Sequence, residues 1–156
     1  MSTYWLKNFI GLRQSEFELL KVPNPGAEFC IHVAFRSIQT GAVLGSIFGP
    51  LSAKLFSNKI ETSKTLTKSF VDGGINGAIA GALLAVPLTY ISLCNMNSVQ
   101  LYDKCYRARF DRTQLMQDRT SFVFATLGYL SSGNVGFVVG LDLSMLLTNV
   151  LDKTWR

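Results

Sequence analysis

The chain has 156 residues, about the length of one domain. Hydrophobic residues make up 48% of it and charged residues 16%, and 15 basic against 10 acidic side chains give a formal net charge of +5. Soluble domains usually carry about 25% charged residues. This composition argues against a disordered chain, a collagen-like fibre and a disulfide-built secreted scaffold, and leaves an integral membrane protein or an apolar-rich globule.

Residues 1–28 mix polar and apolar side chains and carry no net charge. The apolar side chains recur at roughly helical spacing, at Trp5, Leu6, Phe9, Ile10, Phe17 and Leu20. This spacing predicts an amphipathic helix that lies on a membrane surface or on a partner and ends at a turn over residues 23–26. The segment has neither the apolar core of a secretory signal nor the acid-poor pattern of a mitochondrial presequence.

Residues 29–151 form the predicted membrane domain, because long stretches of it carry no charge. The charge-free stretches are residues 73–102, 120–141 and 37–53. The first two exceed the roughly 20 residues that a helix needs to cross a bilayer, and the third does so when extended back to Phe29. We expect spans at about residues 29–55 and 69–93. A soluble helical bundle is the alternative, but its helices would normally show charged outer faces.

The last apolar region, residues 120–151, is too long for one untilted span. A cluster of Ser, Gly and Asn at residues 131–134 is the expected break. We therefore predict two short helices, over about residues 120–132 and 135–151, and four membrane helices in an all-α integral membrane protein. A single broken or tilted helix is the alternative. Residues 152–156 are a tail.

Charged segments join the spans. Residues 54–68 form a basic loop suited to anionic lipid head groups, and residues 96–119 are a mixed-charge connector with room for a short surface helix. The two segments carry four and five basic residues, respectively, so the positive-inside rule does not decide which side of the membrane each occupies.

Small residues recur every fourth position in the apolar segments. The three ladders are Ser37, Gly41, Gly45 and Gly49; Ser69, Gly73, Gly77, Gly81 and Ala85; and Gly128, Ser132, Gly136, Gly140 and Ser144. Such spacing places small residues along one helix face and lets helix backbones approach closely in lipid. The sequence therefore predicts glycine-zipper packing, within the chain first and against other membrane helices second.

A few polar residues stand in apolar surroundings. Arg36 and Asp142 lie inside expected spans, and Asp72 begins one. A charge within a membrane needs a partner, so Arg36–Asp142 and Arg36–Asp72 are the expected ion pairs. Either pair would fix helix order. A polar pathway for a transported ion or segment is the other interpretation.

The chain offers little for catalysis or metal binding. Cys30, Cys94 and Cys105 form no C-x-x-C pair, and His32 is the single histidine. The sequence therefore offers few of the Cys and His ligands that a zinc site needs, and no nucleotide-binding or hydrolase motif occurs. We expect no enzymatic activity, no cofactor and no metal. A Cys30–Cys94 disulfide is left open.

Four membrane helices with these ladders resemble the mitochondrial inner-membrane translocase superfamily, the preprotein and amino-acid transporter family. The resemblance covers about residues 29–151 and rests on four motifs, Gly41-x-x-x-Gly45-x-x-Phe48-Gly49, Asp72-Gly73-Gly74-x-x-Gly77-x-x-x-Gly81, Arg107-x-x-x-Asp111 and Asp118-x-x-Ser121-x-x-x-Ala125. The connector motif departs from the family pattern, because Asp118 and Arg119 stand where two small residues are usual. This departure makes the chain more similar to the branch that supplies accessory subunits to the membrane arm of respiratory complex I.

The resemblance implies a non-catalytic accessory subunit in the mitochondrial inner membrane. Its partners would be the core membrane subunits of complex I and phospholipid, with no nucleic acid. The alternative is a component of an inner-membrane preprotein or solute translocase, or an assembly factor. A translocase component would need a continuous polar face in the membrane.

Overall fold

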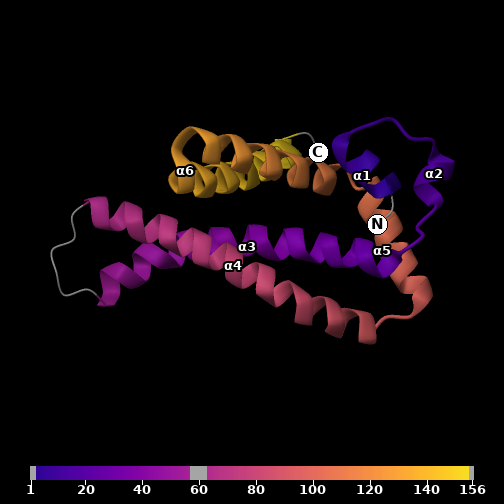
Figure 1. Cartoon of the computed structure of the whole chain (residues 1–156), viewed down its shortest axis with the longest axis horizontal. Helices are drawn as coiled ribbons and strands as arrows, with labels where there is room; N and C mark the ends of the chain where they lie inside the picture. The colour runs from indigo at the N-terminus through magenta and orange to yellow at the C-terminus, as the bar shows by residue number, and fades with distance from the viewer. Residues whose placement is uncertain (1–2, 57–62, 155–156) are drawn as a thin grey trace.

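The computed structural model describes residues 3–56 and 63–154, and these residues are all-helical. The helices are α1 (Thr3–Ile10), α2 (Glu16–Leu20), α3 (Pro25–Phe56), α4 (Ser63–Cys94), α5 (Ser98–Phe110) and α6 (Arg112–Thr154). Figure 1 shows α3 and α4 as a long antiparallel hairpin, with α6 folded back on itself beside it. Helices α1, α2 and α5 gather at one end of the hairpin.

The N-terminal segment differs from the prediction of one amphipathic helix. Helix α1 stops before Gly11, which has φ +89°, a backbone conformation that favours glycine. Helix α2 starts anew after Ser15, whose hydroxyl accepts from the Glu18 backbone N–H while the Glu18 carboxylate accepts from the Ser15 N–H. Of the expected turn at residues 23–26, Pro23 forms a bend, and α3 already begins at Pro25. Pro25 is tolerated there because the first helical turn needs no N–H donor at that position.

The α3–α4 hairpin is packed backbone against backbone along its small residues. A Cβ added at Gly41, Gly45 or Gly49 would overlap the carbonyl oxygen of Gly77, Gly73 or Ser69, respectively. Gly81 faces the Ser37 carbonyl in the same way. The ladder that begins at Ser37 and the ladder that begins at Ser69 thus face each other, position by position, in one antiparallel contact.

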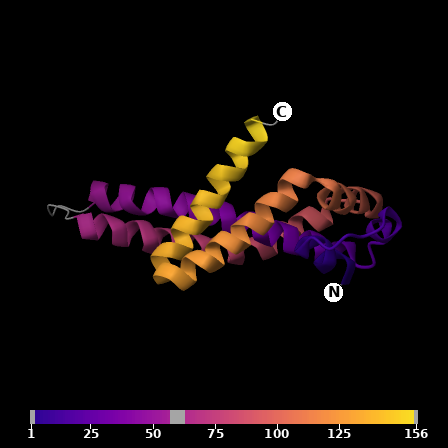
Figure 2. The same cartoon turned by 90° about the horizontal axis from the view of Figure 1, so that it is seen from above.

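Helix α6 is two helices joined at a break, as the cluster at residues 131–134 predicts. Ser132 and Gly133 leave helical geometry, and Gly133 has φ +60°. We call residues 112–131 the first arm and residues 134–154 the second arm; Figure 2 shows both arms from above, meeting at the bend. The predicted ladder along one face is therefore split, and exposed Ser132 lies in the break, so its expected part in helix packing is wrong.

The two arms of α6 approach each other through the remaining glycines of that ladder. A Cβ at Gly128 would overlap the Gly136 carbonyl oxygen, and one at Gly136 would overlap that of Gly128. Gly140 faces the Phe124 carbonyl. Gly74 of α4 has no room for a side chain because Val138 of the second arm fills that space.

Two helical stretches, Thr65–Cys94 and Arg112–Leu151, are long and apolar enough to cross a membrane. The prediction of four spans is therefore shown only in part. Helix α3 is long enough but carries His32, Arg36 and Gln39 in its N-terminal half. The second stretch contains the bend of α6 and does not run as one straight rod.

Among the described residues, polar side chains are buried and many large apolar side chains are exposed, the reverse of the usual arrangement in a soluble protein. Gln39, Ser46 and Ser144 are among the largest fully buried side chains, whereas the buried apolar cluster is small, made of Ala42, Ala78, Ala125 and Leu141. Large apolar side chains cover the outside, among them Leu83 of α4 at 70% exposure and Leu130 of α6 at 75%. In soluble monomers, exposed large apolar side chains are usually scattered singly among polar ones.

The segments between the long helices are described only in part. The surface helix expected within residues 96–119 is confirmed as α5. The expected boundary at residue 28 falls inside α3. Residues 57–62 of the predicted basic loop and residues 155–156 of the tail lie outside the described residues.

Candidate functional site

A polar seam joins the N-terminal half of α3 to the start of α6. We use this name for His32, Arg36, Gln39, Gln117 and Asp118. The Gln39 amide donates to Asp118 Oδ1 over 3.0 Å, and the Arg36 guanidinium donates to Gln117 Oε1 over 2.7 Å. Gln39, Gln117 and Asp118 are buried. Each of these contacts joins residues about 80 positions apart, so the seam fixes how α6 sits on α3.

Hydroxyl contacts continue the polar interior between the arms of α6. The hydroxyl oxygens of Ser121 and Ser144 lie 2.8 Å apart, and those of Thr120 and Thr148 lie 3.3 Å apart. Small hydroxylated side chains link neighbouring helices without holding them apart. The first and second arms are therefore joined by hydrogen bonds at one end and by glycine contacts near the bend.

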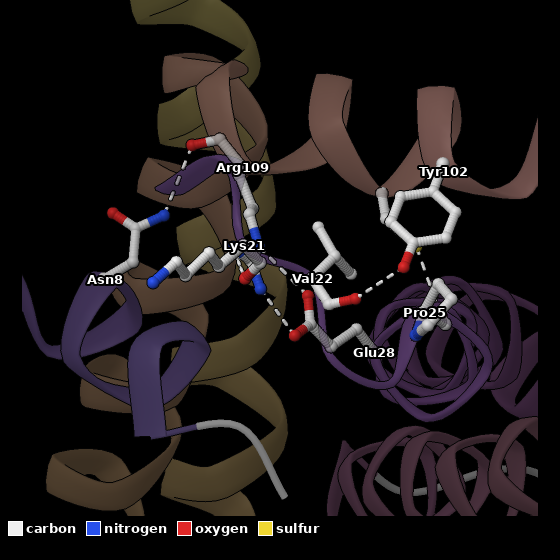
Figure 3. A network of polar contacts seen from close by, with 8 residues as sticks. Asn8, Lys21, Val22, Pro25, Glu28, Tyr102 and Arg109 are labelled. Atoms are coloured by element: carbon white, nitrogen blue, oxygen red, sulfur yellow. Dashed lines mark hydrogen bonds and ion pairs between the residues drawn. The ribbon is translucent and has the colours of Figure 1, made fainter. Parts of the chain in front are cut away.

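Arg109 of α5 ties three segments of the chain together (Figure 3). Its Nε and Nη2 donate to the Glu28 carboxylate over 3.0 and 2.5 Å, and its Nη1 donates to the Lys21 carbonyl over 3.0 Å. The Asn8 amide donates to the Arg109 carbonyl over 3.2 Å. The side chains of Arg109 and Glu28 are 2% and 7% exposed, so this is a buried, two-pronged ion pair.

Two further contacts from α5 hold the chain between α2 and α3. The Tyr102 hydroxyl donates to the Val22 carbonyl over 3.0 Å (Figure 3). The Cys105 thiol donates to the Pro25 carbonyl over 3.2 Å. We call these contacts and those of Arg109 the latch. The latch explains how an N-terminal segment with little buried apolar surface is held on the bundle.

Cys105 is not poised to act as a nucleophile. Burial, reinforced by the nearby Glu28 carboxylate, raises the pKa of the Cys105 thiol to about 11, so the thiolate is scarce at neutral pH. Cys30, Cys94 and Cys105 are all free, and the Cys30–Cys94 disulfide does not form. Within residues 3–56 and 63–154, no group of His, Cys, Asp and Glu is arranged to hold a metal ion.

A cavity of about 330 Å³ opens where the latch meets the polar seam. Its walls come from α1, α3, α5 and α6 and combine three phenylalanines with charged groups of both signs. The polar lining includes His32, Asp111 and Asp118, and the rings are Phe9, Phe29 and Phe35. The size and mixed lining are those of a site for a small amphipathic molecule.

The expected partners of Arg36 are not the observed ones. Arg36 bonds to Gln117, Asp72 is exposed on α4, and neither Arg36–Asp72 nor Arg36–Asp142 is among the ion pairs of the described residues. Asp142 interacts with Ser46 of α3, but its buried Oδ1 has no hydrogen-bond partner within the part of the chain that the structure describes. The register between α3 and α6, which the sequence does not display, decides these partners.

Sequence reasoning missed the Glu28–Arg109 pair and the seam residues Gln39, Gln117 and Asp118. Glu28 and Arg109 lie in segments that read as polar connectors, where charges are ordinary. Glu28 directly precedes the apolar start of the first expected span, but Arg109 lies among other charged residues, so the sequence gives no signal for their pairing.

Residues 5–151 match the family described as "Protein of unknown function (DUF1757)". The chain belongs to this family. No curated protein matches the chain.

This match corrects the resemblance to the mitochondrial inner-membrane translocase superfamily, which no family match supports. The physical reason is that small residues four apart meet a general requirement for close backbone approach. Such ladders recur in closely packed membrane helices of unrelated proteins, so they carry no family identity. Within this DUF1757 member they mark the α3–α4 hairpin and the arms of α6.

Proposed function

We propose that the chain is a non-catalytic membrane protein that packs against the membrane helices of a larger complex. The observation that carries this proposal is the inverted exterior, with large apolar side chains outside and polar ones inside. In water, such a surface would drive aggregation, whereas lipid tails or apolar helices cover it without cost.

Four crossings are the finer part of this proposal. Helices α3 and α4 each have 32 residues and the arms of α6 have about 20 each, enough for a bilayer core of about 30 Å. Both termini and α5 would then lie on one side of the membrane, and Lys54 and Lys68 would mark the other. The polar seam of α3 would face protein, where Arg36 is hydrogen-bonded to Gln117 and Asp118 to Gln39 instead of meeting lipid.

We propose that glycine-zipper packing holds the helices of this chain together. Lipid provides no hydrophobic drive for helix association, so van der Waals contact between closely approaching backbones must hold the hairpin together. The overlaps that a Cβ would make at Gly41, Gly45 and Gly49 support this role. With its small residues used internally, the chain is left with large apolar side chains to meet lipid and partners.

A transport role is the second interpretation that the sequence raised, and the polar seam is the feature that bears on it. Its side chains hydrogen-bond to one another between α3 and α6. Because these side chains use their hydrogen-bonding groups on one another, the seam favours a structural role over a pathway for hydrophilic cargo. Assignment to complex I or to the mitochondrial inner membrane depended on the resemblance that the family match replaces, so the proposal names neither.

The test combines extraction, sizing and crosslinking of the full chain in the membranes of the cells that make it. We expect the chain to stay in the pellet after alkaline carbonate treatment and to run on native gels far above the size of the chain alone. A photo-crosslinking residue in place of exposed Leu83 should capture other membrane proteins, whereas the same residue in place of fully buried Val138 should not. Release by carbonate would refute membrane insertion, and migration as a lone chain would refute the complex.

Single cysteines, in a chain whose native cysteines are replaced by serine, test the four crossings. A cysteine at Lys68 should react with a membrane-impermeant maleimide from one side only. A cysteine at Lys153 should react only from the opposite side. Labelling of both from the same side would contradict the proposed topology.

A further inference from the structure

The cavity beside the latch is lined by charges of both signs at different depths. Asp118 lies deep, with its side chain 9% exposed. Arg107, at the other extreme, has its side chain 78% exposed, and Lys104 is exposed too. One acid, Asp118, is therefore buried inside the cavity, whereas both bases, Lys104 and Arg107, are exposed to solvent.

We propose that this cavity binds a zwitterionic phospho-ammonium head group, of the phosphocholine or phosphoethanolamine kind, with its ammonium innermost and its phosphate at the mouth. The same head group exists on membrane lipids and as a soluble molecule. The proposal therefore does not depend on the membrane role proposed above.

The inner end suits an ammonium group. Asp118 Oδ1 already accepts from the Gln39 amide, but Oδ2 is 3.7 Å from His32 Nδ1, beyond ordinary hydrogen-bond length. That oxygen keeps lone pairs for a cation. The rings of Phe9 and Phe35 stack with centroids 5.7 Å apart and line the same cavity as Asp118. Aromatic rings and a carboxylate in one site attract substituted ammonium ions.

The mouth suits a phosphate. Lys104 Nζ lies 5.8 Å from the centre of the Phe29 ring, at the edge of the cavity. Arg107 forms an exposed ion pair with Asp103 at 2.9 Å. Exposed pairs of this kind contribute little stability, so the Arg107 guanidinium can turn to a phosphate, which it binds in two-pronged fashion.

The charge balance selects a zwitterion over a simple ion. Glu28 and Arg109 neutralise each other within the wall. The remaining charged lining residues are two acids, Asp111 and Asp118, and two bases, Lys104 and Arg107. A plain anion that filled the cavity would meet the two carboxylates, and a plain cation would have to pass the two bases. A ligand with both charges, ammonium first, meets the opposite charge at each end.

The test uses the full chain purified in a maltoside detergent, with binding followed by phosphorus NMR. The probes are short-chain phosphatidylcholine, soluble phosphocholine, inorganic phosphate and short-chain phosphatidylglycerol. We expect phosphatidylcholine to bind at least about tenfold more tightly than phosphatidylglycerol or phosphate. Equal binding of phosphocholine would identify the head group alone as the ligand, and much weaker binding would identify a membrane lipid. Binding of phosphatidylglycerol as tight as that of phosphatidylcholine would overturn the proposal.

Variants locate the site. Asp118→Asn should weaken phosphatidylcholine binding about tenfold or more, and Lys104→Gln should weaken it several-fold. Because Asp118→Asn also alters the seam, Ala108→Phe provides a second test that fills the cavity from α5 and replaces no residue of the latch or the seam. Its control is Ala80→Phe on the exposed face of α4. Loss of binding in Ala108→Phe alone would support the site, and equal binding by both variants would refute it.

Discussion

Substitution of Gly45 by alanine tests the close contact of α3 with α4. A Cβ at Gly45 would overlap the Gly73 carbonyl oxygen, and it would lie 2.8 Å from the Gly73 carbonyl carbon and 3.0 Å from Gly77 Cα. All three atoms are backbone, so no side chain can rotate away. The helices must separate by about 1 Å, and overpacking of this kind costs about 1–3 kcal/mol.

Gly26→Ala is the matched control within the same helix. A Cβ at Gly26 meets nothing within 4 Å. Alanine favours helix over glycine by about 1 kcal/mol in a helix interior, as at Gly45, and by less in the first turn, where Gly26 lies. The difference between the two variants is therefore a lower bound on the steric cost at Gly45.

The assay is equilibrium unfolding in detergent micelles, followed by circular dichroism as a denaturing detergent is added. We expect Gly26→Ala to be as stable as the unmodified chain or more so, and Gly45→Ala to be less stable than Gly26→Ala by about 1–3 kcal/mol. Equal stability of the two variants would refute the backbone contact between α3 and α4.

Three further predictions concern buried polar groups. Arg109→Ala should lower the free energy of unfolding by about 3–5 kcal/mol, because it strands Glu28, and limited proteolysis should then cut the N-terminal segment; unchanged proteolysis would contradict the latch. At pH 8, iodoacetamide should modify exposed Cys94 and spare Cys105, whose reaction should appear only as the pH approaches its pKa of about 11. Rapid modification of Cys105 at pH 8 would be inconsistent with its burial. Because the pKa of the folded-state thiol is raised from 9.0, its contribution to the free energy of unfolding is complete below pH 9 and is lost as the pH rises through 11. Asp142→Asn should raise stability by about 1 kcal/mol in the unfolding assay, since it removes a carboxylate whose buried Oδ1 has no partner within the described residues, and destabilisation would point to a bound proton or water at that oxygen.

Local features of the fold were readable from the sequence. Ser132 and Gly133 were placed at the break of α6, because Ser, Gly and Asn favour backbone that leaves the helix. The α5 helix and the small-residue faces of α3 and α4 follow from local composition and spacing. Each of these features depends on residues within one or two turns of one another.

The contacts of the candidate site were not readable, because they depend on the register of distant segments. Arg36 was expected to meet an aspartate and instead meets Gln117, 81 residues away. Helix periodicity places a side chain on a face but does not say which residue of another helix lies opposite. The N-terminal helix was misjudged for a local reason: Gly11 ends it, and the capping box at Ser15 starts another.

The latch has a consequence for the order in which the chain is made. Arg109 follows Glu28 by 81 positions, and the carbonyl it reaches at Lys21 is 88 positions away. At ribosomal speeds of about 5–20 residues per second, the N-terminal segment waits roughly 5–15 seconds for its partner. During that interval both long helices, α3 and α4, have already left the ribosome. The first segment to be synthesised is thus among the last to be secured, and its release from the ribosome and its docking are separate events in biogenesis.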